Sequence, residues 1–358
     1  MFKQRIKVLG AGPSGLAAAI TLAKNNVQTE IYEKRAECGT HFKGDLQGLE
    51  NWSATQDVLE EFKSLGIEAN FQYTPFTRLW GVDAKQNRTL FQSASPLFYL
   101  VKRGPFSGSF DLALKRQALD LGVHIHFQQT ISVAEADIVA SGPVAAEIYA
   151  LDAGIAFQTD HPDIAYGMAN NQSACLGYSY LLVADGYGCM ATVLFDRYPD
   201  IHRQFEAAKR TFIELTGVTI RNPRPVGGFG SFSHRGGYVR EGRLYVGEAA
   251  GLQDLLWGFG IRYAVRSGNL AARCLLEGRD YAQAAHDLFA GSLRAAVVNR
   301  FIWEQMGNKG YTLFLQLGRR SKDPRRFLYN FFRYSGLKRA AFPLALRELR
   351  RRHRPLQY

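Results

Sequence analysis

The sequence predicts an α/β fold in which a parallel-sheet domain is interleaved with an antiparallel-sheet domain and followed by a helical C-terminal region. Three observations predict it. A glycine-rich turn joins the first strand to the first helix, a second glycine-rich motif follows about 230 residues later, and alternating aromatic segments lie between them. Parallel strands need a crossover connection, so a strand–helix–strand order at the start of the chain indicates a parallel sheet.

The first motif lies between a strand predicted over residues 5–10 and a helix predicted over 14–25. It reads Gly10-Ala11-Gly12-Pro13-Ser14-Gly15. In such a turn Gly10 permits the tight bend, Gly12 lets the backbone approach a pyrophosphate, and Gly15 permits close helix–strand packing. The helix N-terminus then presents unpaired N–H groups to the phosphates. The motif predicts a Rossmann-like, dinucleotide-binding domain.

The second strand is predicted over residues 27–32 and is followed by Glu33 and Lys34, which we include in the nucleotide site. A carboxylate at this place accepts hydrogen bonds from a ribose diol. It would repel the 2′-phosphate of NADP, so Glu33 argues against NADP at this site.

The second motif reads Gly247-Glu248-Ala249-Ala250-Gly251, followed by Gly258-Phe259-Gly260-Ile261. It resembles the second FAD signature of the glutathione-reductase-type flavoproteins, in particular the geranylgeranyl reductase group and the related aromatic hydroxylases. The resemblance implies that Glu248 binds ribose or ribityl oxygens. It also implies that Gly258, Gly260 and Ile261 let a helix N-terminus approach the flavin ring. Glu248 replaces the usual aspartate, and the usual proline before the second glycine pair is absent.

Two further segments carry the resemblance. Arg103 stands where these proteins place an arginine that contacts FAD, and Tyr178-Ser179-Tyr180 is similar to an aromatic strand that lines the substrate pocket of geranylgeranyl reductases. An aromatic strand of this kind is more often ordinary core. On the loop after the second strand, His41 or Asp45 is a candidate proton donor or an ordinary polar residue of the loop.

The resemblance implies an FAD-dependent oxidoreductase that transfers a hydride to or from a carbon–carbon bond of an apolar, isoprenoid or lipid substrate. Flavin carries such chemistry itself, and the protein supplies orientation and electrostatics. NAD(P)H or a protein would donate the electrons. A flavin-dependent monooxygenase is the first alternative, and a non-catalytic flavin-binding protein of a membrane-associated complex is the second.

The domains are predicted to alternate along the chain. The FAD-binding domain takes residues 1–66, 103–150 and 237–280, the substrate domain takes 67–102 and 151–236, and the helical basic region takes 281–358. Residues 38–52 are expected to form a loop.

Positive charge is concentrated at the C-terminus. Residues 319–358 hold 13 Lys and Arg against 2 Asp and Glu, a net +11 out of +12 for the whole chain. A cationic segment with aromatic residues suits an anionic membrane surface. A packed helical subdomain with a solvated basic face is the alternative. Nucleic-acid binding is not expected, because no recognised binding module accompanies the charge.

The composition of the whole chain is that of an ordinary globular protein, with 46% hydrophobic and 21% charged residues. The four cysteines form no CxxC pair, so neither a zinc site nor a disulfide framework is expected. No signal peptide and no apolar stretch of about 18 residues stands out. We therefore expect a cytoplasmic protein, peripheral on a membrane if the basic region binds one.

Overall fold

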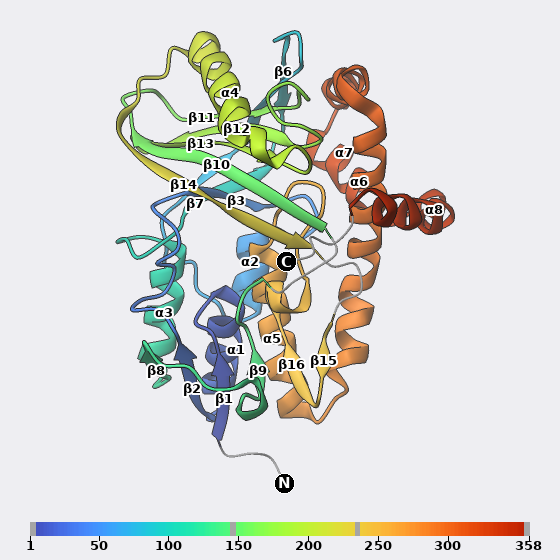
Figure 1. The fold of residues 1–358 in the computed structure, drawn as a ribbon. Coiled ribbons are helices and arrows are strands. Elements are labelled where there is room, and N and C mark those ends of the chain that lie inside the picture. Colours follow the sequence, from blue (N-terminus) through green and yellow to red (C-terminus); the bar gives the residue numbers. More distant parts are fainter. Residues whose placement is uncertain (1–4, 144–147, 233–236, 354–358) are drawn as a thin grey trace.

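The computed structural model describes residues 5–143, 148–232 and 237–353. Its lower half in Figure 1 is built on a six-stranded sheet in the order β15-β16-β9-β1-β2-β8. All neighbouring strands of this sheet pair in parallel except β15 and β16. The strands are β1 (Arg5–Leu9), β2 (Gln28–Glu33), β8 (His124–Phe127), β9 (Ile138–Val139), β15 (Val239–Arg240) and β16 (Arg243–Tyr245).

The upper half of Figure 1 is a seven-stranded sheet in the order β14-β10-β13-β12-β11-β5-β6, in which only β11 and β5 pair in parallel. Helix α4 (Ile201–Thr216) covers its outer face. The strands are β5 (Arg78–Val82), β6 (Arg88–Gln92), β10 (Ile148–Gln158), β11 (Ile164–Met168), β12 (Tyr178–Ala184), β13 (Tyr187–Leu194) and β14 (Arg221–Phe232).

A three-stranded antiparallel sheet connects the two halves. It consists of β3 (Leu46–Glu50), β7 (Phe98–Lys102) and β4 (Tyr73–Phe76), with β7 in the centre. Side chains alternate along a strand, so Tyr99 and Val101 of β7 join the core of the parallel-sheet half, whereas Phe98 and Leu100 join the core below the large sheet. This one strand therefore contributes to both cores.

Helices pack around the parallel sheet and along one side of the molecule. Helix α1 (Pro13–Lys24) packs against α3 (Phe110–Asp120) and α5 (Ile261–Glu277), and α2 (Val58–Ser64) lies nearby. Short turns are η1 (Val133–Glu135), η2 (Tyr198–Asp200) and η3 (Gly247–Ala250). Helix α6 (Tyr281–Arg320) runs along both halves at the right of Figure 1, followed by α7 (Pro324–Phe332) and α8 (Gly336–Arg352).

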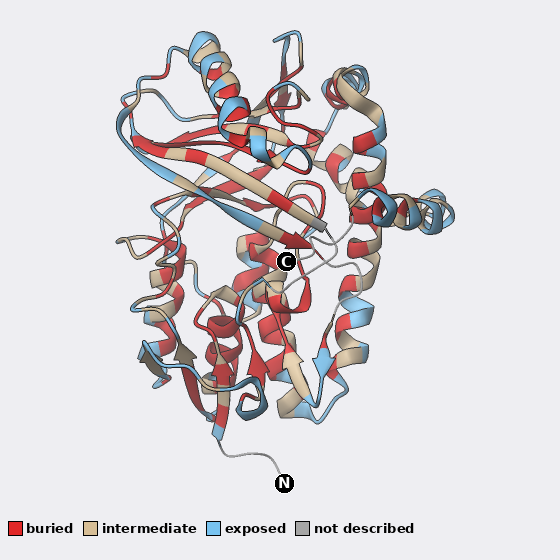
Figure 2. Ribbon diagram, viewed as in Figure 1, coloured by how far each residue is buried: buried red, intermediate tan, exposed pale blue. Residues whose placement is uncertain are grey.

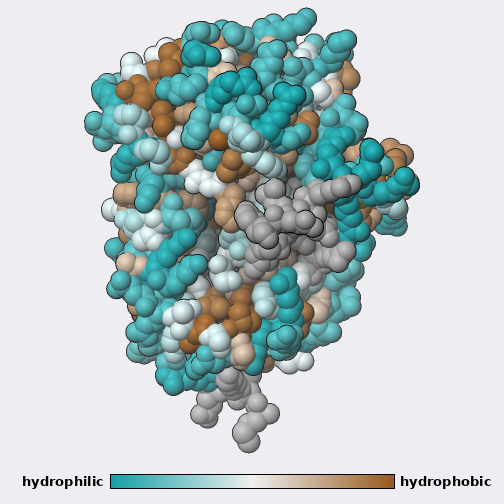
Figure 3. Space-filling model, viewed as in Figure 1, coloured by the Kyte–Doolittle hydropathy of each residue, from teal (hydrophilic) through white to brown (hydrophobic). Residues whose placement is uncertain are grey.

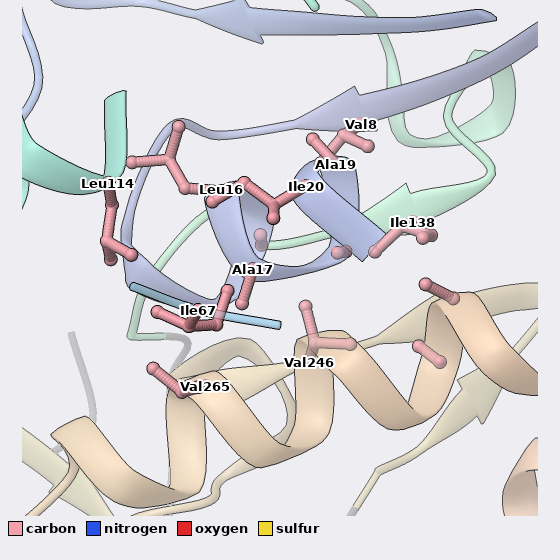
Figure 4. Packing of buried hydrophobic residues seen from close by; sticks show 14 of the residues in the cluster. Val8, Leu16, Ala17, Ala19, Ile20, Ile67, Leu114, Ile138, Val246 and Val265 are labelled. Atoms are coloured by element: carbon pink, nitrogen blue, oxygen red, sulfur yellow. The ribbon is translucent and has the colours of Figure 1, made fainter. Parts of the chain in front are cut away.

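Helix α1 lies at the centre of the core of the parallel-sheet half. Figure 4 shows Leu16 and Ile20 of this helix on the side of Val8 (β1) and Ile138 (β9), and Ala17 on the opposite side, toward Val265 of α5. Helices α1 and α5 cross closely at Gly268 of α5. A Cβ atom added there would lie 2.0 Å from the Ser14 carbonyl oxygen, so only glycine fits at this position. Burial of these apolar side chains, at about 25 cal/mol per Å², fixes the position of the first glycine motif.

The predicted fold class is confirmed: the chain has a Rossmann-like sheet, a second largely antiparallel sheet and C-terminal helices. The expectation of a loop over residues 38–52 was wrong in part, because residues 46–50 form β3. Only Leu46, Leu49 and Glu50 of this strand are buried. That pattern is too irregular to predict a strand, whose pairing with β7 depends on contacts with distant residues.

The C-terminal helices pack through an aromatic cluster rather than extending from the body. Helix α6 breaks at Gly307, which has φ 56°, and its second half continues toward the large sheet. The cluster is centred on Trp257, which precedes the second glycine pair and has ring centroids 6.0 Å from Trp303 and 5.2 Å from Phe332. Helices α6 and α7 therefore contact the loop of the second glycine motif directly, through Trp257.

Candidate flavin site

The glycines of the first motif differ in whether the surrounding protein leaves space for a side chain. Gly10 has φ 105°, and a Cβ atom added there would lie 2.3 Å from the Ala140 carbonyl oxygen. A Cβ atom at Gly15 would lie 2.1 Å from the Gly10 carbonyl oxygen. Gly12 has φ −77°, and a Cβ atom there would meet no described atom within 4 Å. The fold thus requires glycine at positions 10 and 15, whereas a glycine at position 12 keeps space for a ligand.

Helix α1 begins beside that space with Gly12 as its N-cap residue and Pro13 as its first residue. No described side chain caps the helix, and its first turn holds no acidic residue. Free N–H groups and the positive end of the helix dipole therefore face the space next to Gly12, which suits a pyrophosphate.

Glu33 lies at the end of β2 and organises the turn. Its carboxylate accepts hydrogen bonds from the backbone N–H groups of Ala11 (2.9 Å) and Arg35 (3.0 Å). Each carboxylate oxygen keeps a second lone pair, which leaves Glu33 able to accept from a ribose hydroxyl as well. Lys34 is exposed just beyond the strand.

The second motif lies against the first. Gly247 has φ 59°, and a Cβ atom added there would lie 2.7 Å from the Ser14 hydroxyl oxygen in the first turn of α1. The Gly247 N–H donates to the Ser267 hydroxyl on α5 at 2.9 Å. Two segments separated by about 230 residues in sequence thus meet at the N-terminus of α1.

Glu248 follows this contact, and its carboxylate forms no hydrogen bond or ion pair with the described residues. Burial raises the pKa of Glu248, and the positive charge of Arg103 offsets this in part. An unpartnered carboxylate is costly, and ribose or ribityl hydroxyls are donors that would satisfy it. The residues present therefore fit the ribose part of FAD.

Arg103 is buried and fully engaged within the protein. It forms a bidentate pair with Asp111 at 2.9 Å through both contacts and donates to the Gln47 side chain at 2.6 Å. This pair, together with the Gly104 N–H, lowers the pKa of Asp111 against the effect of its burial. Arg103 thereby fixes the loop after β7 and adds positive charge near Glu248.

The remaining predicted residues lie at the start of α5. Gly258 has φ 74°, Gly260 is the N-cap residue of α5, and Ile261 is its first residue. No side chain of the described residues caps this helix, so its N–H groups also face outward from the helix end. A Cβ atom at Gly258 would lie 3.2 Å from the Tyr178 hydroxyl oxygen, and that hydroxyl donates to the Trp257 carbonyl oxygen at 2.5 Å. The large sheet thus meets the second motif through Tyr178.

We call the side of the large sheet that faces this motif the inner face. Alternation places Tyr178, Tyr180 and Leu182 of β12 there, beside Cys189 of β13. On β10 the same alternation places Asp152 on the inner face, opposite Gly228 of β14. A Cβ atom at Gly228 would contact only the Asp152 Oδ1 atom, at 3.7 Å, among the described atoms. Around Tyr178, Tyr180 and Leu182 the inner face is apolar and aromatic, and Asp152 is a carboxyl group beside these residues.

Asp152 is a functional candidate that sequence reasoning missed. Burial, with a smaller contribution from the charge of Asp45, raises the pKa of Asp152 to about 6. The pKa of Asp45 is also raised by burial. Partial burial and the positive charges of Arg35 and Arg103 lower the pKa of His41 to about 4, so His41 is neutral at neutral pH. The signal available in the sequence was a single carboxylate in the otherwise apolar strand 150–157.

The described residues hold no group of three side chains that could bind a metal ion. All four cysteines are buried as free thiols. Burial raises the pKa of the Cys38 thiol, which makes it a poor nucleophile.

Comparisons with known proteins agree with this geometry. Residues 8–46 match the family model of an NAD(P)-binding Rossmann-like domain. The structure is similar to a geranylgeranyl bacteriochlorophyll reductase-like protein from Thermoplasma acidophilum, with 17% identity, coverage of 96% of this chain and 98% of that chain, and a TM-score of 0.74. It is also similar to a flavin-dependent brominase, with 16% identity, coverage of 97% and 99%, and a TM-score of 0.67.

A third similar structure is a p-nitrophenol 4-monooxygenase from Pseudomonas putida, with 13% identity, coverage of 97% and 98%, and a TM-score of 0.56. The chain has the fold of the FAD-dependent oxidoreductases. FAD is the cofactor with which this fold and the two glycine motifs agree. A search of the curated proteins found no match to the sequence.

Proposed function

We propose that this protein is an FAD-dependent oxidoreductase that transfers a hydride to or from a carbon–carbon bond of an apolar substrate, of the isoprenoid or lipid class. The observation that carries the proposal is the meeting of the two glycine motifs at the N-terminus of α1. There Gly12 borders open space and Glu248 has no described partner.

Within this proposal, each part of the motifs has one task. The N–H groups at the start of α1 bind the pyrophosphate, and Glu248 accepts from ribose or ribityl hydroxyls. The start of α5 lies near the flavin ring, where its dipole favours negative charge. FAD, when bound, supplies the hydride chemistry. The protein's own contribution is to hold FAD and to position a substrate against it.

The inner face of the large sheet supports an apolar substrate. Tyr178 and Tyr180 lie next to the second motif, with rings 6.4 Å apart, and they continue into the aromatic cluster around Trp257. When a hydride adds to one carbon of a double bond, the other carbon needs a proton. Asp152 is the candidate acid, because a carboxyl with a pKa of about 6 retains its proton more readily than an ordinary aspartate.

A flavin-dependent monooxygenase is the second candidate, and the similarity to the monooxygenase and brominase structures favours it. A flavin-binding protein without turnover is the third. In the monooxygenase the inner face would bind an aromatic or apolar molecule to be oxygenated.

One experiment separates the three candidates. The purified protein would be reduced with dithionite without oxygen and mixed with a long-chain isoprenoid alcohol that contains double bonds. Reoxidation of the flavin together with a product two hydrogens heavier would support the reductase. In a second mixture, of the oxidised protein with the corresponding saturated alcohol, bleaching of the flavin would indicate the reverse reaction. Reaction only after oxygen is admitted, with an oxygenated product, would indicate the monooxygenase. Absence of all these changes would contradict both enzymes.

We also propose that the basic C-terminal region docks on an anionic membrane surface. No helix in the described part of the chain is long and apolar enough to span a membrane. On α8, Leu337 is 86% exposed and Leu344 55% exposed, and exposed Arg339 and Arg347 lie among them. Figure 3 shows mostly hydrophilic residues over α8. Each Lys or Arg near such a surface contributes about 1 kcal/mol. The full-length protein should pellet with anionic vesicles at low salt but not with neutral ones, and failure to pellet would contradict this docking.

A further inference from the structure

A pair of cations without a carboxylate partner among the described residues lies at one end of the inner face. The side chain of Lys102, the last residue of β7, places its Nζ atom 4.4 Å from the centre of the Tyr187 ring and 5.2 Å from that of Phe106. Arg224 of β14 donates to the Tyr187 hydroxyl at 3.1 Å, and its guanidinium carbon lies 5.7 Å from the centre of the Phe106 ring. The two cations therefore share the same two aromatic neighbours.

Neither cation is neutralised within the described chain. Neither Lys102 nor Arg224 forms an ion pair with a described residue. Burial and the charge of Arg224 lower the pKa of Lys102, as expected for two like charges held close together. On the adjoining loop, the Asp45 carboxylate accepts from the Lys43 N–H at 2.8 Å and forms no ion pair with either cation. Two cations held together without a counter-charge favour an anionic ligand.

The orientation of the strands separates this pair from the nucleotide motifs. Alternation along β7 places Lys102 on the face of Phe98 and Leu100, which belong to the core below the large sheet. Arg103, the next residue, points to the opposite face, where it binds Asp111. On β14, Arg224 shares its face with Val226, which packs against that same core. Both cations therefore belong to the substrate side of the molecule.

The distance along the sheet fits an extended ligand. Arg224 lies opposite Ala156 and Gly228 lies opposite Asp152, so the two pairs are four residues apart along the strands. At about 3.3 Å per residue this is about 13 Å. Strand β14 is an edge strand with mostly exposed residues, as Figure 2 shows. A ligand can therefore reach the stretch of the inner face between Arg224 and Asp152 from solvent.

We propose that Lys102, Arg224 and the Tyr187 hydroxyl form a binding site for a phosphate-class anion. The anion is carried by a ligand whose apolar part lies along the inner face toward Asp152 and Tyr178. This inference rests on the proposed function and specifies its substrate class as an apolar chain with a phosphate head group. The phosphates of a dinucleotide electron donor share this chemistry, and the experiment separates the two sources.

The test measures binding to the full-length FAD-loaded protein by calorimetry, with dodecyl phosphate and dodecanol as probes. We expect dodecyl phosphate to bind at least 10-fold more tightly than dodecanol. In the double variant K102M/R224M this preference should fall below 3-fold, with FAD content unchanged. The matched control is R221M, because Arg221 lies on the same strand but pairs with Asp160. That variant should retain the preference.

A second arm compares NADPH with NADH on the same variants. A preference for NADPH that disappears in K102M/R224M, with equal binding of dodecyl phosphate and dodecanol, would keep the anion site and assign it to the electron donor. No phosphate preference with either pair of probes would overturn the inference while leaving the flavin assignment intact. A protein that holds no FAD would instead contradict the proposed function.

Discussion

The two sides that meet at the centre of this molecule treat their charged residues differently. On the nucleotide side Arg103 is held by Asp111 and Gln47, Glu33 is held by two backbone N–H groups, and Glu248 lacks a described partner. On the substrate side Asp152, Lys102 and Arg224 all lack an ion pair among the described residues.

This difference matches two different tasks. The nucleotide side is built for one constant ligand, so nearly every polar group is fixed before the ligand arrives, which lowers the entropic cost of binding. The substrate side keeps its charged groups without ion pairs among the described residues, with Asp152 about 13 Å along the sheet from Arg224. Unpaired groups cost stability, and a bound ligand can recover that cost.

The largest expected effect comes from Gly12. Replacing it by valine leaves the fold intact, because φ −77° suits any residue and the added Cβ atom meets no described atom. The side chain would occupy the pyrophosphate position, so we expect FAD affinity to fall at least about 1,000-fold, or about 4 kcal/mol. Titration of the FAD-free protein with FAD measures it.

The matched control for that variant is Gly10→Ala. Its φ of 105° and the 2.3 Å approach to Ala140 predict loss of folding stability rather than selective loss of FAD. A valine at position 12 that binds FAD with ordinary affinity would show that the space beside it is not the pyrophosphate site.

Trp257→Ala tests the connection between the C-terminal helices α6 and α7 and the loop that carries Gly258. Its ring contacts aromatic residues of α6 and α7, so its loss leaves a cavity and should cost about 3 kcal/mol in the free energy of unfolding. FAD should also dissociate faster, because the loop that carries Gly258 loses its support. Trp80→Ala, in the separate core under α4, should destabilise without changing FAD release. Equal FAD release in both variants would argue against the connection.

Glu248→Gln should destabilise the FAD-bound protein without destabilising the FAD-free protein. Loss of a charged acceptor should weaken FAD binding by about 2 kcal/mol, or about 30-fold. The FAD-free protein should become no less stable, because a carboxylate without a described partner is removed. Thermal unfolding with and without FAD measures both effects. The exposed Glu241, exchanged for Gln, is the control, and a parallel loss of stability in both forms of the Glu248 variant would contradict the assigned role.

Asp152→Asn tests the substrate side alone and should have the smallest effect. The pKa of Asp152 rises to about 6 on folding, so the folded protein holds this proton more tightly than the unfolded chain does. Stability from this group is therefore present at low pH and decreases as the pH rises from about 4 to about 6. Relative to the parent, the variant should gain about 1–2 kcal/mol between pH 4 and pH 8.

Denaturant unfolding at both pH values checks this prediction, with the exposed Asp120 exchanged for Asn as the control for loss of one negative charge. FAD affinity should stay unchanged. A pH-independent difference from the parent would show that Asp152 is ordinarily ionised.

The sequence predicted those features that depend on short-range patterns. The first motif and the acid after the second strand lie within 24 residues, and hydrophobic spacing identified the helices around them. Asp152, Lys102, Tyr187 and Arg224 could not be found in this way, because they come from four segments that meet only when β7, β10, β13 and β14 take their places. Strand pairing between distant segments depends on the whole core, which no local pattern encodes.

The most direct test of the flavin assignment is the visible absorption spectrum of the purified full-length protein, with the cofactor identified after release by heat. The structure predicts the bands of oxidised flavin at about 370 and 450 nm and one released FAD per chain. A colourless protein that also fails to take up added FAD would contradict the assignment, and with it the proposal that the two glycine motifs form a flavin site.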